Sequence, residues 1–173
     1  MSDLARFFWE LSTLRRAPQD LPASPWLMQL LLVLHLLVNT LLGLEVFASP
    51  FRALLAGVLD LVLSGTLLFA ALQIRGHAGR WLQAYTGLLG MGVVLGTCGL
   101  LYRLLGQLLG VPGVAAMLDL GLFFWSLLAI GHILRHALNI RLPFAILIAF
   151  AYTIFLFGLT AQWLAPELAS QSP

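Results

Sequence analysis

The chain has 173 residues, of which 61% are hydrophobic and 9% are charged, and its formal net charge at pH 7 is +2. Soluble domains carry about 25% charged residues and about 45–50% apolar residues, so these few charges could not cover a globule of this size in water. The composition therefore excludes a soluble enzyme, a nucleic-acid-binding protein and a disordered chain, and it indicates a polytopic membrane protein. The single cysteine, Cys98, excludes an internal disulfide and a cysteine-rich metal site.

Residues 1–16 have the pattern of an amphipathic helix, because apolar and polar side chains fall on opposite faces at helical spacing. The apolar face holds Leu4, Phe7, Phe8, Leu11 and Leu14, and the polar face holds Arg6, Glu10, Thr13 and Arg16. This helix is too short to span a bilayer, so we expect it to lie along the cytoplasmic headgroup layer. The alternative is a helix docked on the protein's own loops. The proline-rich residues 17–25 predict an extended connector into the membrane.

Five apolar stretches follow, each long enough to cross about 30 Å of hydrocarbon at about 1.5 Å per residue. They predict an all-α fold in which residues 26–164 form five transmembrane helices and residues 165–173 form an external tail. The predicted helices run over Trp26–Phe47, Phe51–Ile74, Trp81–Leu105, Val114–Leu134 and Leu142–Leu164.

The segments between these stretches alternate between many arginines and few. If the amino terminus is cytoplasmic, the cytoplasmic segments hold seven arginines and the external segments hold two. Arginines near span ends stay on the cytoplasmic side, so we expect a cytoplasmic amino terminus and an external carboxyl terminus. The seven are Arg6, Arg15, Arg16, Arg75, Arg80, Arg135 and Arg141, and the two are Arg52 and Arg103.

Ionisable residues inside apolar spans are costly, so each needs a partner or a function. Asp60 and Asp119 are expected at the bilayer midplane or on its external side, with Arg103 as the counter-charge of one of them. His35 and Asn39 lie four residues apart on one helical face, at a depth that Asp60 also reaches. These residues predict either clamps between helices, which we favour, or a cavity that handles protons or solutes.

The sequence offers little for metal binding or catalysis. His132 and His136 are four residues apart with His77 in a loop on the same side, but the set lacks a cysteine or a carboxylate, so we interpret these histidines as interfacial. No G-x-S-x-G elbow, phosphate-binding loop or dinucleotide fingerprint is present. We therefore expect a non-enzymatic protein without a metal or another cofactor.

Small residues predict where helices pack closely. Gly92 and Gly96 form a G-x-x-x-G step in the third span, and Ala145 and Ala149 repeat this spacing in the fifth. Such steps let helix backbones approach one another in lipid. We expect the third helix to be central to the bundle, and we favour packing within one chain over dimerisation through this face.

The whole-chain layout resembles the Yip family (Ypt-interacting proteins), which has a cytoplasmic amino-terminal segment, five spans and an external carboxyl terminus. The stretch 20–26, Asp-Leu-Pro-Ala-Ser-Pro-Trp, is similar to the family's Asp-Leu-x-Gly-Pro entry into the first span, with one extra residue and no glycine. The stretch 83–87, Gln-Ala-Tyr-Thr-Gly, is similar to the Gly-Tyr-Ser region of the third span, with alanine in place of glycine. The resemblance is to the bacterial members, so it implies the bacterial inner membrane and does not carry over the GTPase binding of the eukaryotic members.

Together these patterns predict a scaffold or accessory protein whose partners are membrane lipids or other membrane proteins, and not nucleic acid. The alternative is a small transporter or channel component that uses Asp60 and Asp119.

Overall fold

The computed structural model describes residues 2–47, 49–110 and 112–164. Within these ranges all regular structure is helical, and five helices are long and apolar enough to cross a membrane. They are α2 (Pro25–Gly43), α3 (Pro50–Ile74), α4 (Trp81–Leu108), α5 (Pro112–Leu138) and α6 (Leu142–Leu164). The prediction of an all-helical chain with five helices of spanning length is therefore confirmed. The expected external tail, 165–173, lies outside the described residues.

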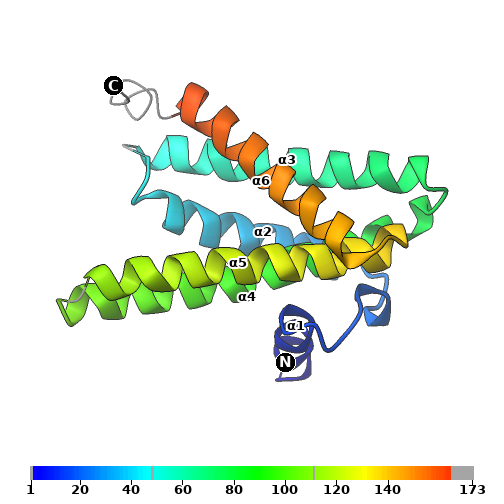
Figure 1. Ribbon diagram of the computed structural model, residues 1–173, viewed down its shortest axis with the longest axis horizontal. Coiled ribbons are helices and arrows are strands. Elements are labelled where there is room, and N and C mark those ends of the chain that lie inside the picture. The colour runs from blue at the N-terminus through cyan, green and yellow to red at the C-terminus, as the bar shows by residue number, and fades with distance from the viewer. Residues whose placement is uncertain (1, 48, 111, 165–173) are drawn as a thin grey trace.

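Successive long helices run in opposite directions, and α6 is inclined to the others (Figure 1). The end of the bundle that holds the α3–α4 and α5–α6 turns carries Arg75, Arg80, Arg135 and Arg141, and we call it the basic end. The α2–α3 and α4–α5 turns lie at the other end, which we call the distal end. An odd number of spans places the start of α2 at the basic end and the end of α6 at the distal end.

Several helix boundaries differ from the predicted ones. The first long helix, α2, ends at Gly43, four residues before Phe47. At this end α2 approaches α3 closely, since a Cβ on Gly43 would lie 3.0 Å from the Ala53 Cβ. The fourth, α5, extends four residues beyond Leu134 and ends where Asn139 adopts a φ of +54°. There the amide of Ile140 donates to the carbonyl of Arg135 at 3.2 Å, a helix-ending bond that a polar left-handed residue permits.

The amino-terminal helix, α1 (Ser2–Ser12), is shorter than the predicted 1–16. Leu14 has a φ of +63°, so it is not part of the apolar face to which we assigned it. The amide of Arg15 donates to the Glu10 carbonyl at 2.8 Å, which closes the helix end. The connector is also not wholly extended, because Pro18–Asp20 forms a 3₁₀ turn, η1, that begins on a proline.

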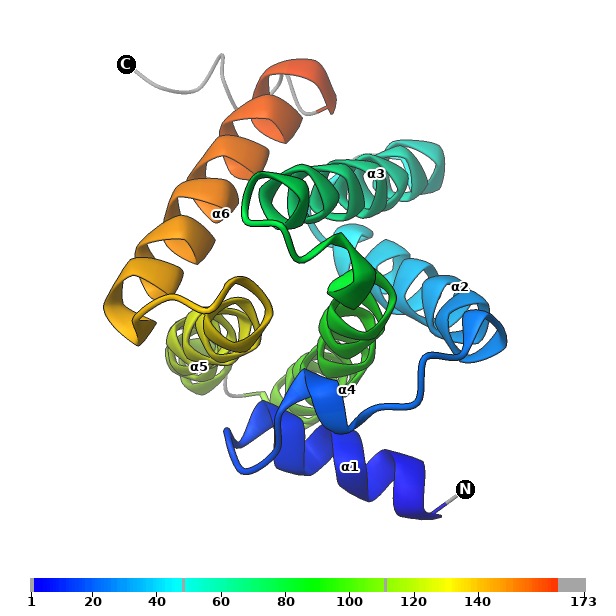
Figure 2. The same ribbon diagram turned by 90° about the vertical axis from the view of Figure 1, so that its right-hand side faces the viewer.

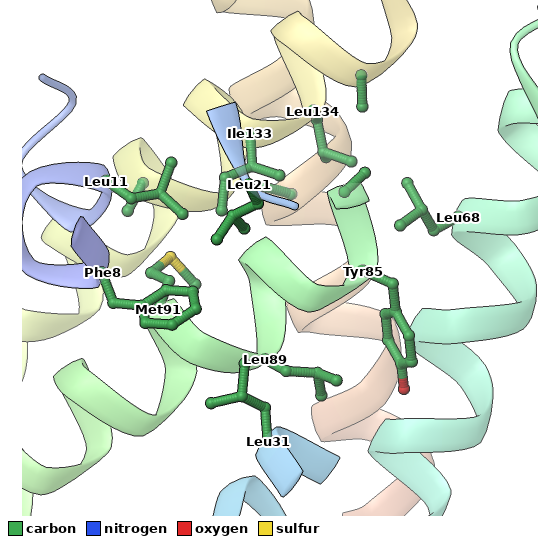
Figure 3. Packing of buried hydrophobic residues seen from close by; sticks show 14 of the residues in the cluster. Phe8, Leu11, Leu21, Leu31, Leu68, Tyr85, Leu89, Met91, Ile133 and Leu134 are labelled. Carbon is green, nitrogen blue, oxygen red and sulfur yellow. The ribbon is translucent and has the colours of Figure 1, made fainter. Parts of the chain in front are cut away.

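Helix α1 docks on the side of the bundle instead of lying beyond its end (Figures 1 and 2). Its apolar residues Phe7, Phe8 and Leu11 are buried within the protein. Figure 3 shows Phe8 beside Met91 of α4, and Leu11 turned toward Leu21 and Ile133. The Leu11 Cδ2 lies 3.5 Å from the position of a Cβ on Gly87. The apolar face of α1 therefore packs against α4 where glycine leaves the α4 backbone uncovered.

The buried core lies toward the basic end. Its residues come from α1, the beginnings of α2, α4 and α6, and the ends of α3 and α5. Helix α4 is central to this arrangement, because it contacts α1, α2, α3 and α5. The distal halves of the helices are more exposed and carry apolar side chains such as Leu101, Leu104 and Met117, as lipid-facing helices do.

Candidate functional site: an intramembrane polar cluster

Three helices contribute to a polar cluster near the middle of the bundle, formed by His35 of α2, Asp60 of α3 and Tyr152 of α6. The Nε2 atom of His35 lies 3.3 Å from the Asp60 Oδ2. The Tyr152 hydroxyl donates to the Asp60 Oδ1 at 2.6 Å and also lies 3.2 Å from the Asp60 main-chain oxygen. Both carboxylate oxygens of Asp60 therefore have a partner on another helix. We call these three residues the central polar cluster.

The depth of the central polar cluster follows from the helix rise. Asp60 lies ten residues after Pro50 and 14 residues before Ile74, or about 15 Å and about 21 Å at about 1.5 Å per residue. His35 lies ten residues after Pro25, again about 15 Å. The cluster is thus about halfway through the bundle, where water is scarce and an unpartnered carboxylate would be most costly.

A glycine on α4 makes room for the imidazole ring of His35. A Cβ on Gly92 would lie 2.5 Å from the His35 Nδ1, so the imidazole packs directly on the α4 backbone. Nδ1 is buried and has no hydrogen-bond partner among the described residues. If Nε2 donates to an ionised Asp60, Nε2 must carry a proton. Nδ1 then has a free lone pair when the ring is neutral, or an N–H without an acceptor when the ring is charged.

A second set of bonds joins α3 to the beginning of α4. The Tyr85 hydroxyl donates to the Leu61 carbonyl at 2.7 Å, and the Trp81 indole N–H donates to the Gly65 carbonyl at 3.0 Å. The two aromatic rings stack with centroids 5.3 Å apart. A Cβ on Gly65 would lie 3.1 Å from the Tyr85 Cζ, so this glycine lets the ring approach α3. These contacts fix the segment of α3 that carries Asp60.

Asn39, which we grouped with His35 and Asp60, is not bonded to either of them. Its side chain makes no hydrogen bond in the ranges that the structure describes. Its Cβ lies 3.9 Å from the position of a Cβ on Gly57. Asn39 therefore faces the contact between α2 and α3 one turn away from His35, toward the distal end.

A second polar cluster lies at the distal end and consists of Glu45, Tyr102, Arg103 and Asp119. Arg103 donates from Nε and Nη2 to the Asp119 Oδ1, at 2.9 and 2.8 Å. Its Nη1 donates to the Glu45 Oε2 at 2.8 Å, and the Tyr102 hydroxyl donates to the Asp119 Oδ1. Arg103 is thus the counter-charge of Asp119, and it also pairs with Glu45. We call these four residues the distal polar cluster.

The histidines at the basic end take part in anchoring the amino-terminal segment. His132 Nε2 lies 2.8 Å from the Arg16 main-chain oxygen, and its ring meets that of His136 edge-on with centroids 4.7 Å apart. His77 is separate from them, in the turn before η2 (Ala78–Arg80). Among the described residues, no group of three or more His, Cys, Asp or Glu side chains could hold a metal ion.

Two further bonds attach the amino-terminal segment to α5. The Trp125 indole donates to the Ser12 carbonyl at 2.7 Å, and the Gln19 amide donates to the His136 carbonyl at 2.8 Å. The Gln83 amide of α4 donates to the Leu21 carbonyl at 2.7 Å. Side chains from two spans therefore satisfy carbonyls of a segment that has few backbone bonds of its own.

The small residues lie at helix contacts within the chain. Gly96 meets Val38 of α2, because a Cβ there would lie 2.5 Å from the Val38 Cγ1, and Gly92 meets His35. On α6, Ala145 and Ala149 are fully buried. The G-x-x-x-G step of α4 is thus occupied by α2.

Sequence reasoning missed the tyrosines that complete both clusters, Tyr152 and Tyr102. A tyrosine in an otherwise apolar span is a signal for a buried acceptor, because its hydroxyl needs a partner away from water. The signal does not say which helix supplies that acceptor. Tyr152 reaches an acid 92 residues away in the chain, a pairing that only the packing of α3 against α6 creates.

Comparison of the chain with protein-family models, with curated protein sequences and with solved structures gives no match. The resemblance to the Yip family therefore stays a prediction from the sequence, and the function must be argued from the geometry of the two clusters.

Proposed function

We propose that the protein is a non-enzymatic membrane scaffold or accessory factor whose partners are lipids or other membrane proteins. The observation that carries this proposal is that the intramembrane carboxylates bond to neighbouring helices. Asp60 accepts from α6 and lies against a histidine of α2, and Asp119 accepts from α4. Bonds of this kind clamp helices together in a medium where apolar burial supplies little drive for association.

The arrangement of the acids favours clamps over a relay. A proton relay needs groups that exchange protons with water on both sides of the membrane. The central polar cluster and the distal polar cluster share no hydrogen bond in the described ranges, so Asp60 and Asp119 do not form one chain. Of the hollows on the described surface, the polar one at the basic end and the apolar one between α5 and α6 are lined by neither Asp60 nor Asp119.

The lipid-facing surface supports the choice of partners. Large apolar side chains are exposed along all five spans, and they include Val33, Phe69, Leu104, Phe124 and Phe157. Such a surface suits acyl chains or the apolar helices of other membrane proteins.

We further propose that the protein lies in a bacterial inner membrane with the basic end cytoplasmic, as in the bacterial Yip family proteins that its layout resembles. The support is the arginine count, seven against two, which places the basic end inside by the positive-inside tendency.

Helix α1 adds a membrane-facing feature to this proposal. Its apolar face packs inside the protein, and its other face carries Arg6 and Glu10. Arg6, and Arg16 beyond the helix end, donate hydrogen bonds of 2.9 and 2.8 Å to the Glu10 carboxylate. Gly90, on which Phe8 packs, lies ten residues from Arg80, or about 15 Å along α4. We propose that α1 sits within the cytoplasmic leaflet, at nearly the depth of the central polar cluster, and that its charged face draws lipid headgroups and water inward.

The alternative is a small transporter or channel component that uses Asp60 and Asp119. The specific observation in its favour is the buried His35 Nδ1, which has no hydrogen-bond partner in the described part of the chain and lies beside an acid in mid-membrane. A buried imidazole with a free nitrogen can accept a proton when its neighbour changes state. In this case Asp60 would act with His35, and Asp119 would act separately.

Two substitutions at Asp60 separate the alternatives. Asp60→Asn removes the charge but keeps an oxygen that accepts from Tyr152, whereas Asp60→Leu removes both. A clamp predicts a small loss of thermal stability for Asp60→Asn and a loss of about 1–3 kcal/mol for Asp60→Leu. Asp3→Asn is the matched control, because Asp3 is an exposed acid of α1.

The measurements are thermal unfolding in detergent and proton flux in proteoliposomes. If Asp60→Leu unfolds at the parental temperature, the clamp is refuted. If the parent conducts protons and Asp60→Asn stops this flux without loss of stability, the transporter is the correct function.

A further inference from the structure

A polar hollow of about 600 Å³ opens at the basic end of the bundle. Figure 2 looks onto this end, where η1, η2 and the α5–α6 turn come together. The volume is in the range of ligand pockets, about 300–1,000 Å³. Its polar lining is supplied by Gln19, Arg80, Arg135, His136, Asn139 and Arg141.

The charges of this hollow are of one sign. Three guanidinium groups, from Arg80, Arg135 and Arg141, line it, and the lining includes no carboxylate. Arg80 is engaged, since its Nη1 lies 3.4 Å from the His136 carbonyl and 3.5 Å from that of Ala137. The side chains of Arg135 and Arg141 make no hydrogen bond or ion pair in the ranges that the structure describes. Two unpaired arginines beside a third repel one another, and an anion between them would remove this repulsion.

A second hollow of about 440 Å³ lies between α5 and α6 and is almost wholly apolar. Its lining includes Leu128 of α5 and Leu147 of α6. The linings of the two hollows are adjacent in the chain at the start of α6, where Leu142 lines the polar one and Pro143 lines the apolar one. Arg135 follows Leu128 by seven residues, so both lie on one face of α5.

We propose that the two hollows bind one anionic phospholipid, with the phosphate against Arg135 and Arg141 and an acyl chain in the α5–α6 groove. Arginine suits this role because its planar group donates two parallel bonds to phosphate oxygens. Basic pockets between helices at the cytoplasmic membrane surface bind acidic headgroups by the same chemistry. The inference depends on the proposed membrane location, but it holds whether the protein is a scaffold or a transporter.

The test is lipid binding to the full-length protein in detergent, measured by native mass spectrometry. Phosphatidylglycerol is compared with phosphatidylcholine of the same acyl chains, and inorganic phosphate is added as a competitor. We expect phosphatidylglycerol to bind and phosphatidylcholine to bind much more weakly. If phosphatidylcholine binds equally, or if millimolar inorganic phosphate displaces phosphatidylglycerol, the assignment to an anionic lipid is overturned.

The variants Arg135→Gln and Arg141→Gln test the phosphate site. Since neither side chain holds the fold together through a described hydrogen bond, both variants should fold, which thermal unfolding checks. Each should weaken phosphatidylglycerol binding about fivefold. Arg15→Gln is the control, because it removes one charge at an exposed position outside the hollow. An equal loss for Arg15→Gln would show diffuse charge attraction and overturn the site.

The groove is tested by Leu147→Trp, which fills it, against Ile148→Trp on the neighbouring, also exposed position outside it. We expect Leu147→Trp to weaken phosphatidylglycerol binding severalfold and Ile148→Trp to leave it unchanged. Equal binding by both variants would show that no acyl chain occupies the groove, and it would refute the two-part site. These outcomes are independent of the Asp60 substitutions, which report on helix clamping and flux.

Discussion

The docking of α1 on α4 gives the sharpest prediction about stability. Phe8 packs on Gly90, where a Cβ would lie 2.6 Å from the phenyl Cζ, and Phe8 is only 4% exposed. Gly90→Leu would therefore expel the Phe8 ring from its site. Gly121→Leu is the matched control, because Gly121 is also in a helix and a Cβ there meets nothing within 4 Å.

The magnitude follows from the burial of one ring. Losing the burial of a phenylalanine costs about 1.5–3 kcal/mol, while the gain in helix propensity from replacing glycine, about 1 kcal/mol, is the same in both variants. The difference between Gly90→Leu and Gly121→Leu should thus be about 1.5–3 kcal/mol. For a chain of this length this corresponds to a difference in Tm of about 3–12 °C.

Two assays test this prediction. The first is thermal unfolding in detergent. The second is the reaction of a water-soluble maleimide with Ser12→Cys in a Cys98→Ala background, since Ser12 is fully buried when α1 is docked. Labelling should be slow in the parent and in Gly121→Leu, and fast in Gly90→Leu. Adding Phe8→Ala to Gly90→Leu should slow the labelling again, because the clash is removed. Equal unfolding temperatures and equal labelling in Gly90→Leu and Gly121→Leu would refute the docking.

Three further predictions concern the polar groups. Tyr152→Phe removes the hydroxyl that donates to Asp60 at 2.6 Å, so the free energy of unfolding should fall by about 1–3 kcal/mol; no change on chemical denaturation would contradict the clamp. Arg103→Gln should cost only about 1 kcal/mol because its pair with Asp119 is partly exposed; in a double-mutant cycle this loss should be smaller in an Asp119→Asn background, where only the pair with Glu45 remains. Hydrogen bonds from two arginines hold the pKa of Glu10 below its ordinary 4.5, so this contribution is present at neutral pH and is lost as the pH falls through the lowered pKa. Tm should therefore fall on acidification below pH 4.5, and Glu10→Gln should reduce this fall; an identical fall in both proteins would show that the Glu10 ion pairs do not stabilise the fold.

The sequence by itself determined the fold class and the number of spans. Hydrophobic stretches of more than 18 residues have one stable solution in lipid, a helix that satisfies its own backbone bonds. The structure starts α2, α3 and α5 on prolines, one or two residues before the predicted first residues. Local chemistry was less informative at helix ends, since α2 stops four residues before the predicted Phe47 and α5 continues four residues beyond the predicted Leu134.

The candidate site could be predicted only in part. Sequence spacing and depth brought His35 and Asp60 together, because residues at one depth on neighbouring helices can meet. Spacing and depth did not predict Tyr152, which bonds to Asp60. They also wrongly included Asn39, which lies beside Gly57 in the contact between α2 and α3 and does not bond to the cluster. Which faces of two helices meet is set by rotation about their axes, and no local pattern encodes this rotation.

The position of α1 shows most clearly what only the tertiary structure decided. Its amphipathic pattern is the same for a helix on a lipid surface and for a helix on a protein surface, because both partners are apolar. The choice rests on a complementary surface elsewhere in the chain, here the stripe of Gly87 and Gly90 on α4 that receives Leu11 and Phe8. The amphipathic pattern of α1 predicts which of its side chains are buried, whereas the surface of α4 determines where they are buried.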